Sequence, residues 1–356
     1  MTHAVLIALL LVSLPSAQPN SQVANEAATM IDRETQAALE SAIIDFMSLV
    51  DAKAATVAVS RNGKLLYSAG FGFHDQNKQT PVSPKALFRI ASVSKPMTAA
   101  AIKTAIRTGK LSLDTKAFEL LEMSKAHGEP ADPRLKNITI GHLLKHEGGW
   151  DRDIGFDPMF QGVRILQTAQ PDANITASDV VEYMWQQPLQ FTPGEKSVYS
   201  NFGYCVLGRV LEKTYDKPFI KVMQKLVFEP KTIDEVRLGT SDSGKRPQNE
   251  VEYPIRDSAF LLDVMDAHGG MIASAPALCR FLDAYWISGE PREPGPSYRY
   301  TFFGSLPGTT AMARQRSDGF NIAVLLNARR DDRIHDDLNV LKKAVDRVFD
   351  GKDAIE

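Results

Sequence analysis

A serine and a lysine stand at a spacing that can support nucleophilic catalysis. Ser92 and Lys95 are three residues apart in the segment FRIASVSKPM, and on a helix this spacing places both on one face, one turn apart. A serine hydroxyl is a weak nucleophile until a neighbouring base takes its proton, and a desolvated lysine with a lowered pKa can do so. A helix-capping serine followed by a surface lysine would give the same pattern, so the pair alone leaves both interpretations open.

A tyrosine and an asparagine form a second pair. Tyr199 and Asn201 stand two residues apart in PGEKSVYSN, and in an extended segment this spacing sends both side chains to the same side. A nearby ammonium favours the phenolate of a tyrosine, so Tyr199 can act as a general base and then as an acid toward the leaving group. Asn201 can offer its amide to a lysine and to a substrate carbonyl. The alternative is that Tyr199 is a core aromatic and Asn201 a helix cap.

Each pair stands next to a predicted helix. Residues 98–111 have helical composition and periodicity, Ser92 is a natural N-cap, and Pro96 falls in the first turn, where its missing N–H costs little. The positive field of the helix N-terminus helps to stabilise an alkoxide. Residues 203–215 form a helix-like segment shortly after Asn201. We therefore expect Ser92 to be exposed at a strand-to-helix junction.

Segments near both ends of the chain predict a sheet and two flanking helices. Residues 55–72 alternate around Asn62-Gly63, a pair that tolerates the positive φ angles of a tight hairpin. A similar pattern recurs over 308–328. Apolar residues at helical spacing predict helices over 30–50 and 336–350.

The order of these elements predicts an α+β fold. We expect an antiparallel sheet assembled from the two termini and flanked by the terminal helices, in a catalytic domain spanning residues 30–350. A helical subdomain at about 110–220 is predicted to be inserted into this domain.

Composition and motifs exclude several classes of function. With 356 residues and a formal net charge of −2, the chain does not hold nucleic acid by bulk charge, and it contains no glycine-rich phosphate loop. Cys205 and Cys279 lie in apolar stretches, where buried small side chains are expected. His142 and His146 are four apart, but Leu143 stands where a zinc-binding His-Glu-x-x-His motif has its glutamate. We expect neither a metal nor a cofactor.

The N-terminus resembles an export signal. Residues 4–14 form an apolar run that is too short to span a bilayer but suits the core of a signal peptide, and Pro15 ends it. We expect a signal peptide over 1–17 and a secreted or periplasmic protein, with a retained N-terminal helix as the alternative. No later segment approaches eighteen consecutive apolar residues, so the mature chain is not expected to insert into a membrane.

Together the two motifs resemble a known superfamily. FRIASVSK followed by PGEKSVYSNFGYCVLG is similar to the serine β-lactamases and penicillin-binding proteins, in particular to the class C β-lactamase-related esterases, D-amino-acid peptidases and amidases. The resemblance covers roughly residues 35–345 and implies a β-lactamase/transpeptidase-like fold. It also implies that Ser92 is the acyl-forming nucleophile, Lys95 its activating partner, Tyr199 the proton shuttle and Asn201 a polar substrate contact.

A third motif departs from the pattern of that superfamily. Relatives carry Lys or His, then Thr or another residue, then Gly, on the strand that lines the active site, and here FFGSLPG places Phe302 at the Lys/His position. The resemblance makes Phe302 and Gly304 substrate-binding residues, and it makes the N–H groups of Ser92 and Ser305 the oxyanion hole. The loss of the cation puts recognition of a substrate carboxylate in doubt and favours an apolar acyl or alcohol group.

Two groups of charged residues outside these motifs could contact the substrate. If an arginine replaces the lost cation, Arg314 and Arg316 on the following strand are the nearest in sequence. Asp151-Arg152-Asp153, after Trp150, either borders the cleft or forms a solvated turn, and we favour the turn.

These observations predict a serine hydrolase that cleaves a small-molecule ester, amide or peptide through an acyl-enzyme on Ser92. One alternative is a catalytically weak penicillin-binding-like protein that binds a peptide or a cell-envelope component. The other is a β-lactamase or D-Ala-D-Ala carboxypeptidase, which Phe302 disfavours.

Overall fold

An antiparallel sheet joins the two ends of the chain. The computed structural model describes residues 31–75, 77, 79–255, 260–293, 295 and 297–351. Its larger sheet has five strands in the order β2-β1-β8-β7-β6. The strands are β1 (Ala54–Arg61), β2 (Lys64–Gly72), β6 (Tyr300–Leu306), β7 (Thr309–Gln315) and β8 (Phe320–Leu326). Because β1 pairs with β8, N-terminal and C-terminal strands share one sheet, as the sequence predicts.

The first hairpin follows from its turn residues. Asn62 and Gly63 connect β1 to β2 and both have positive φ, 53° and 76°. Asparagine and glycine tolerate this left-handed region better than other residues, so the pair fixes a tight turn. The predicted hairpin is confirmed.

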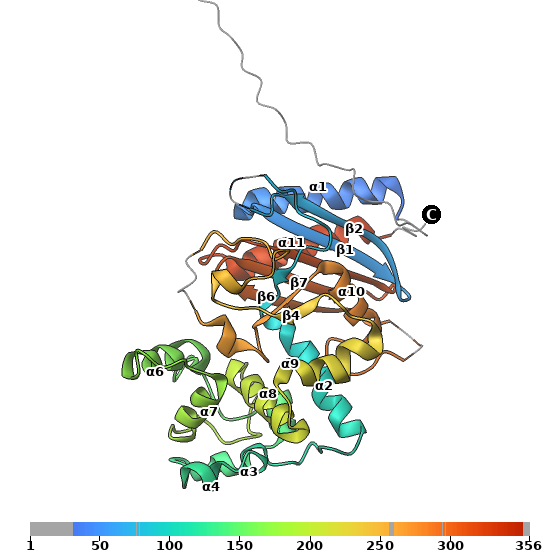
Figure 1. The fold of residues 1–356 in the computed structure, drawn as a ribbon. Coiled ribbons are helices and arrows are strands. Elements are labelled where there is room, and N and C mark those ends of the chain that lie inside the picture. The colour runs from blue at the N-terminus through green and yellow to red at the C-terminus, as the bar shows by residue number, and fades with distance from the viewer. Residues whose placement is uncertain are drawn as a thin grey trace, which may run out of the picture.

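Two terminal helices cover one face of the larger sheet. Helices α1 (Arg33–Val50) and α11 (Ile334–Phe349) pack side by side (Figure 1). Along β7, Met312 belongs to the apolar cluster beneath these helices, whereas its neighbours Ala311 and Ala313 belong to the cluster on the opposite face. This alternation sets which face each later side chain of the strand reaches.

Helices form the centre of the chain. Within the described residues, every named element between β3 (Phe88–Arg89) and β4 (Val236–Leu238) is helical, and these helices form the lower part of Figure 1. The α-helices are α2 (Ser94–Arg107), α3 (Ala117–Leu120), α4 (Met123–His127), α5 (Ile140–Leu144), α6 (Val163–Ala169), α7 (Ala177–Trp185), α8 (Asn201–Tyr215) and α9 (Phe219–Met223). The division into a domain and an inserted subdomain stays a prediction.

A small second sheet links the helices to the larger sheet. Its order is β3-β5-β4, with β5 (Met271–Ala273) in the middle. Helix α10 (Ala275–Ala284) follows β5 and packs on the face of the larger sheet opposite α1 and α11.

Three further sequence predictions concern burial and membranes. Cys205 and Cys279 are both buried and carry free thiols, as expected. No helix in the described part of the chain is long and apolar enough to cross a membrane. The predicted signal peptide over 1–17 lies outside the described residues.

Candidate active site

Ser92 lies on a short turn between the small sheet and helix α2. The 3₁₀ turn Ala91–Val93 leads directly into α2, whose N-cap residue is Val93 rather than Ser92. The predicted N-cap is therefore wrong, and the Ser92 hydroxyl faces other side chains instead. Ala91 has φ of 46°, a left-handed conformation that costs an L-residue about 1–2 kcal/mol. The turn is thus held in place by its surroundings, and it presents Ser92 at the strand-to-helix junction that the sequence predicts.

Lys95 makes three close polar contacts from a buried position. Its Nζ lies 3.2 Å from Ser92 Oγ and donates at 2.8 Å both to Asn201 Oδ1 and to the carbonyl oxygen of His268. Only 1% of the residue is exposed. Burial lowers the pKa of Lys95 to about 7, although the nearby Asp157 carboxylate partly opposes this shift. Near neutral pH the amine is therefore partly unprotonated and can accept a proton.

Tyr199 contacts Ser92 from the other side. Its hydroxyl donates to Ser92 Oγ at 2.8 Å. Burial raises the pKa of Tyr199 to about 12 and outweighs the hydrogen bond to Ser92 and the charge of Arg152, which both lower it. The expectation that Tyr199 is poised as a phenolate base is therefore wrong, because loss of hydration outweighs the charges that favour the phenolate. Tyr199 is a neutral phenol at pH 7 and can donate a proton.

Asn201 connects Lys95 to an acidic residue that the sequence did not single out. Its Nδ2 donates to Asp157 Oδ2 at 2.7 Å, so its Oδ1 must face Lys95. Ser200, not Asn201, caps α8, with Oγ accepting from the backbone N–H of Gly203. Asp157 itself opens a helical segment and accepts from the N–H of Met159. No local motif marks it, because it reaches the site from a separate connector.

The imidazole ring of His146 packs against the ring of Tyr199. Helix α5 ends at Leu144, so His142 and His146 do not share a helix face as their spacing suggested. The imidazole of His146 lies 4.7 Å from the Tyr199 ring, and its Nδ1 accepts from the backbone N–H of Ser200 at 3.1 Å. Burial lowers the pKa of His146 to about 4, so the ring is neutral near pH 7. This arrangement fixes the segment that carries Tyr199.

Strand β6 passes directly beside the Ser92 turn. It is the edge strand of the larger sheet. A Cβ added to Gly304 would lie 2.0 Å from the carbonyl oxygen of Ile90, so only glycine allows this approach. Phe302, two residues earlier on the same face, is half-buried against the main apolar cluster. Ser305 follows Gly304, and its role as an oxyanion donor with Ser92 stays a prediction.

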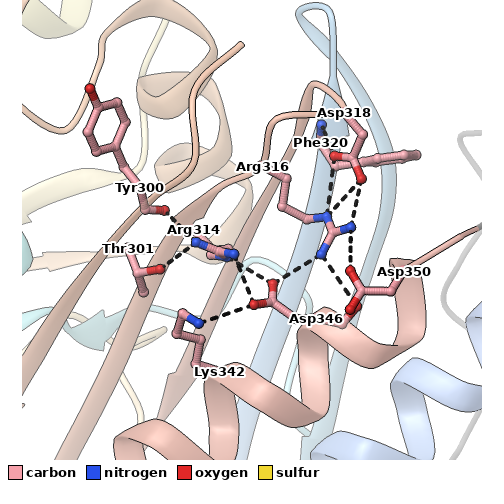
Figure 2. Close-up of polar contacts among 9 residues, drawn as sticks. All are labelled: Tyr300, Thr301, Arg314, Arg316, Asp318, Phe320, Lys342, Asp346 and Asp350. Atoms are coloured by element: carbon pink, nitrogen blue, oxygen red, sulfur yellow. Dashed lines mark hydrogen bonds and ion pairs between the residues drawn. The ribbon is translucent and has the colours of Figure 1, made fainter.

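Arg314 and Arg316 do not reach this site. Both follow Met312 at even spacing and therefore lie on the face of β7 beneath α11. Figure 2 shows the two guanidinium groups converging on Asp346 of α11, with Arg314 Nε and Nη2 each 2.9 Å from its carboxylate. The expectation that either arginine replaces the lost cation is wrong. The two arginines form ion pairs that hold helix α11 against the sheet instead.

The turn after Trp150 borders the site. Trp150 and Asp151 are buried, and the guanidinium carbon of Arg152 lies 5.5 Å from the centre of the Tyr199 ring. The prediction of a purely solvated turn is therefore wrong. A narrow recess lies beside this turn, lined by Trp150, Arg152, Phe156, Asp157, Pro158, Tyr199, Ser200 and Asn201.

The sequence has curated relatives that include an esterase. The probable fimbrial assembly protein FimD of Dichelobacter nodosus (serogroup H1) is 32% identical over 239 residues, 64% of this chain and 56% of that protein. Esterase EstB of Burkholderia gladioli is 30% identical over 199 residues, 53% of this chain and 46% of the esterase. The chain thus spans about half the length of these relatives.

Solved structures share the fold. The D-amino acid amidase of Ochrobactrum anthropi SV3 superposes with a TM-score of 0.67 at 18% identity, covering 88% of this chain and 99% of the amidase. A penicillin binding protein of Bacillus halodurans gives a TM-score of 0.68 at 19% identity, covering 87% and 99%. These likenesses confirm the predicted β-lactamase/transpeptidase-like α+β fold.

A family model described as Beta-lactamase matches residues 39–334, most of the chain. The relatives to which the chain is similar include an esterase, and the structural neighbours include an amidase. The resemblance seen in the two sequence motifs is confirmed, and the chain belongs to the beta-lactamase family.

Proposed function

We propose that this protein hydrolyses esters or amides through an acyl-enzyme formed on Ser92. The observation that carries the proposal is the placement of Ser92 Oγ between two proton-handling groups, with Lys95 Nζ at 3.2 Å and the Tyr199 hydroxyl at 2.8 Å. A nucleophile and its base within hydrogen-bond reach are the signature of covalent catalysis. The base is itself held by Asn201 and by the carbonyl of His268.

In acylation, Ser92 Oγ attacks the substrate carbonyl carbon and its proton passes to the unprotonated amine of Lys95. The resulting oxyanion accepts hydrogen bonds from the backbone N–H groups of Ser92 and Ser305. When the bond to the leaving group breaks, the Tyr199 hydroxyl donates its proton to that group. The Lys95 ammonium, 4.8 Å from the centre of the Tyr199 ring, stabilises the transient phenolate and returns the proton to it.

Deacylation follows with water in place of the leaving group. The unprotonated Lys95 takes a proton from the attacking water, whose oxygen bonds to the acyl carbon. As the bond to Ser92 Oγ breaks, the Tyr199 hydroxyl donates its proton to Oγ, the Lys95 ammonium returns a proton to Tyr199, and the carboxylic acid product leaves. The neutral state of Tyr199 favours donation, and the lowered pKa of Lys95 favours acceptance, so the two roles fall to different residues.

The half-buried phenyl ring of Phe302 favours apolar substrate groups on the β6 side of the site. In the described part of the chain no cation is found against this ring, so a carboxylate desolvated there would lie unpaired, and an unpaired buried charge is costly. We therefore expect a neutral group to be favoured next to Phe302 over the carboxylate that β-lactams and D-Ala-D-Ala peptides would place there. Phe302 also motivates the second candidate, a weakly catalytic protein that binds a peptide or cell-envelope component.

A substrate panel separates these possibilities. Wild-type protein and Ser92→Ala would be assayed with p-nitrophenyl esters, D-amino-acid p-nitroanilides and nitrocefin. We expect turnover of at least the esters by the wild type and its loss in the variant. Binding of substrates without turnover in both proteins would support the weakly catalytic alternative instead.

A further inference from the structure

Arg152 stands at the mouth of the recess beside Tyr199 with most of its hydrogen-bonding capacity unused. Its side chain is 49% exposed. Among the described residues, its contacts are the Tyr199 ring, at 5.5 Å from the ring centre, and Asp157 Oδ2, at 4.0 Å. The second distance exceeds a hydrogen bond, so none of the five N–H donors of the guanidinium makes a hydrogen bond with a described residue.

The carboxylate of Asp157 does not neutralise Arg152 by close pairing. Asp157 Oδ2 accepts from Asn201 Nδ2 at 2.7 Å, and Oδ1 accepts from the backbone N–H of Met159 at 3.0 Å. These bonds orient the carboxylate toward Asn201. The Asp157 carboxylate, 4.0 Å from the guanidinium, is then only a loose ion-pair partner that helps to keep Arg152 above Tyr199. A guanidinium presents two parallel N–H donors that can bind both oxygens of one carboxylate. Arg152 lies near the reacting groups without a close partner, so it is suited to bind a carboxylate of a ligand.

Lys196, a cation close to the same turn, is already paired. Lys196 Nζ lies 3.4 Å from Asp151 Oδ2 and 4.9 Å from the centre of the Phe191 ring. Arg314 and Arg316 are committed to Asp346 on the far face of the sheet. Two cations of the described residues lie over the Tyr199 ring: the buried Lys95, at 4.8 Å from the ring centre, and Arg152, which is the exposed one.

We propose that Arg152 binds a carboxylate of the substrate, so that the favoured substrates are esters or amides carrying a second, remote acid group. This inference rests on the proposed acyl-enzyme function and names its substrate class. The phenyl ring of Phe302 takes the apolar part of such a substrate, and Arg152 takes the anion. Arg152, in the connector after α5, thereby takes the place of the Lys or His that relatives carry at the position of Phe302 on β6.

The test compares matched substrates that differ only in a terminal carboxylate. Mono-p-nitrophenyl adipate and p-nitrophenyl hexanoate share a leaving group and chain length, and they place the acid in the acyl half. The hexanoate ester of 4-hydroxybenzoate and that of its methyl ester place the acid in the alcohol half. For each pair the readout is the ratio of kcat/KM for the acid substrate to that for the neutral one, which cancels general effects on the reacting groups.

We expect the wild-type ratio to exceed one for at least one pair and to fall about 10- to 100-fold in Arg152→Gln, as loss of a charged hydrogen bond does. Arg152→Lys keeps the charge but not the fork, so it should give an intermediate ratio. Lys196→Gln, which removes the paired neighbouring cation, should leave the ratio unchanged. About 0.5 M NaCl should lower the wild-type ratio, because salt screens an exposed charge pair.

Fluorophosphonate labelling of the same proteins separates the two possible failures. If the wild type is labelled on Ser92 but Arg152→Gln leaves both ratios unchanged, the role of Arg152 is refuted and the acyl-enzyme proposal stands. If the wild type is neither labelled nor active on any of the four esters, the acyl-enzyme proposal is refuted and the Arg152 inference with it.

Discussion

Gly304 of β6 lies so close to Ile90 that a methyl group at its α-carbon would meet the Ile90 carbonyl oxygen at 2.0 Å. Ile90 directly precedes the turn Ala91–Val93 that carries Ser92. The edge strand of the larger sheet and the nucleophile therefore come together through a backbone contact, and the geometry of one depends on the other.

This contact predicts the effect of Gly304→Ala. The added methyl group must push β6 away from the Ser92 turn, which moves the Ser305 N–H that we assign to the oxyanion hole. We expect kcat to fall about 100-fold or more, the usual cost of losing one oxyanion donor. Gly203→Ala is the matched control, because a Cβ at Gly203 in α8 would meet its nearest atom at 3.6 Å, an ordinary contact. Near-normal kcat for Gly304→Ala would show that β6 does not supply a donor.

Proton donation by Tyr199 predicts the behaviour of Tyr199→Phe. The change removes only the hydroxyl that contacts Ser92 Oγ, and general acid–base groups typically contribute about a hundred- to ten-thousandfold to rate. Tyr204→Phe is the control, because Tyr204 stacks on the same His146 ring but its hydroxyl is directed to the carbonyl of Leu144. Equal and small losses of kcat in the two variants would return Tyr199 to the role of a core aromatic.

The lowered pKa of Lys95 predicts the acid limb of the pH profile. Only the unprotonated amine accepts the Ser92 proton, so kcat/KM should be lost as pH falls through about 7. Above this pH the rate should stay level until Tyr199 ionises, near pH 12. A limb near pH 4 would instead point to His146.

Asp157→Asn tests the same assignment through charge. The Asp157 carboxylate raises the pKa of Lys95, so its removal should shift the acid limb toward lower pH. The asparagine keeps an oxygen that can accept from Asn201, which limits structural change. A limb that stays in place or moves to higher pH would argue against Lys95 as the titrating base.

The aromatic wall predicts an altered preference in Phe302→Lys. The wild type should hydrolyse p-nitrophenyl butyrate with a higher kcat/KM than nitrocefin, whose carboxylate has no partner at the phenyl ring. The lysine should raise the kcat/KM for nitrocefin relative to that for the ester, by about tenfold or more for one gained charge pair. A wild type that already prefers nitrocefin would show that Phe302 does not set specificity.

Local patterns predicted much of the fold because they report backbone preferences. Asn62-Gly63 marks a tight turn wherever it occurs between β-rich segments, and the amphipathic segments near both ends form α1 and α11. Ser92 with Lys95, and Tyr199 with Asn201, were found because each pair lies within a few residues and matches a superfamily motif.

The remaining features depend on burial and on long-range packing, which spacing does not report. Asp157 reaches Asn201 from 44 residues away, and the His268 carbonyl reaches Lys95 from 173 away. The pKa of Tyr199 rises because the fold removes water from it, whatever charge lies nearby. Arg314 was misplaced because its strand face is settled by pairing within the sheet.

The central claim is that Ser92 forms a covalent acyl-enzyme, and one mass measurement tests it. The protein would be treated with a fluorophosphonate, digested, and the modified peptide sequenced by mass spectrometry, alongside Ser92→Ala and Ser94→Ala. Ser94, whose hydroxyl donates to the Ala91 carbonyl, is the neighbouring serine that should not react. We predict a single adduct on Ser92 that is lost only in Ser92→Ala. An adduct on another residue, or an unmodified wild type under conditions that label a known serine hydrolase, would contradict it.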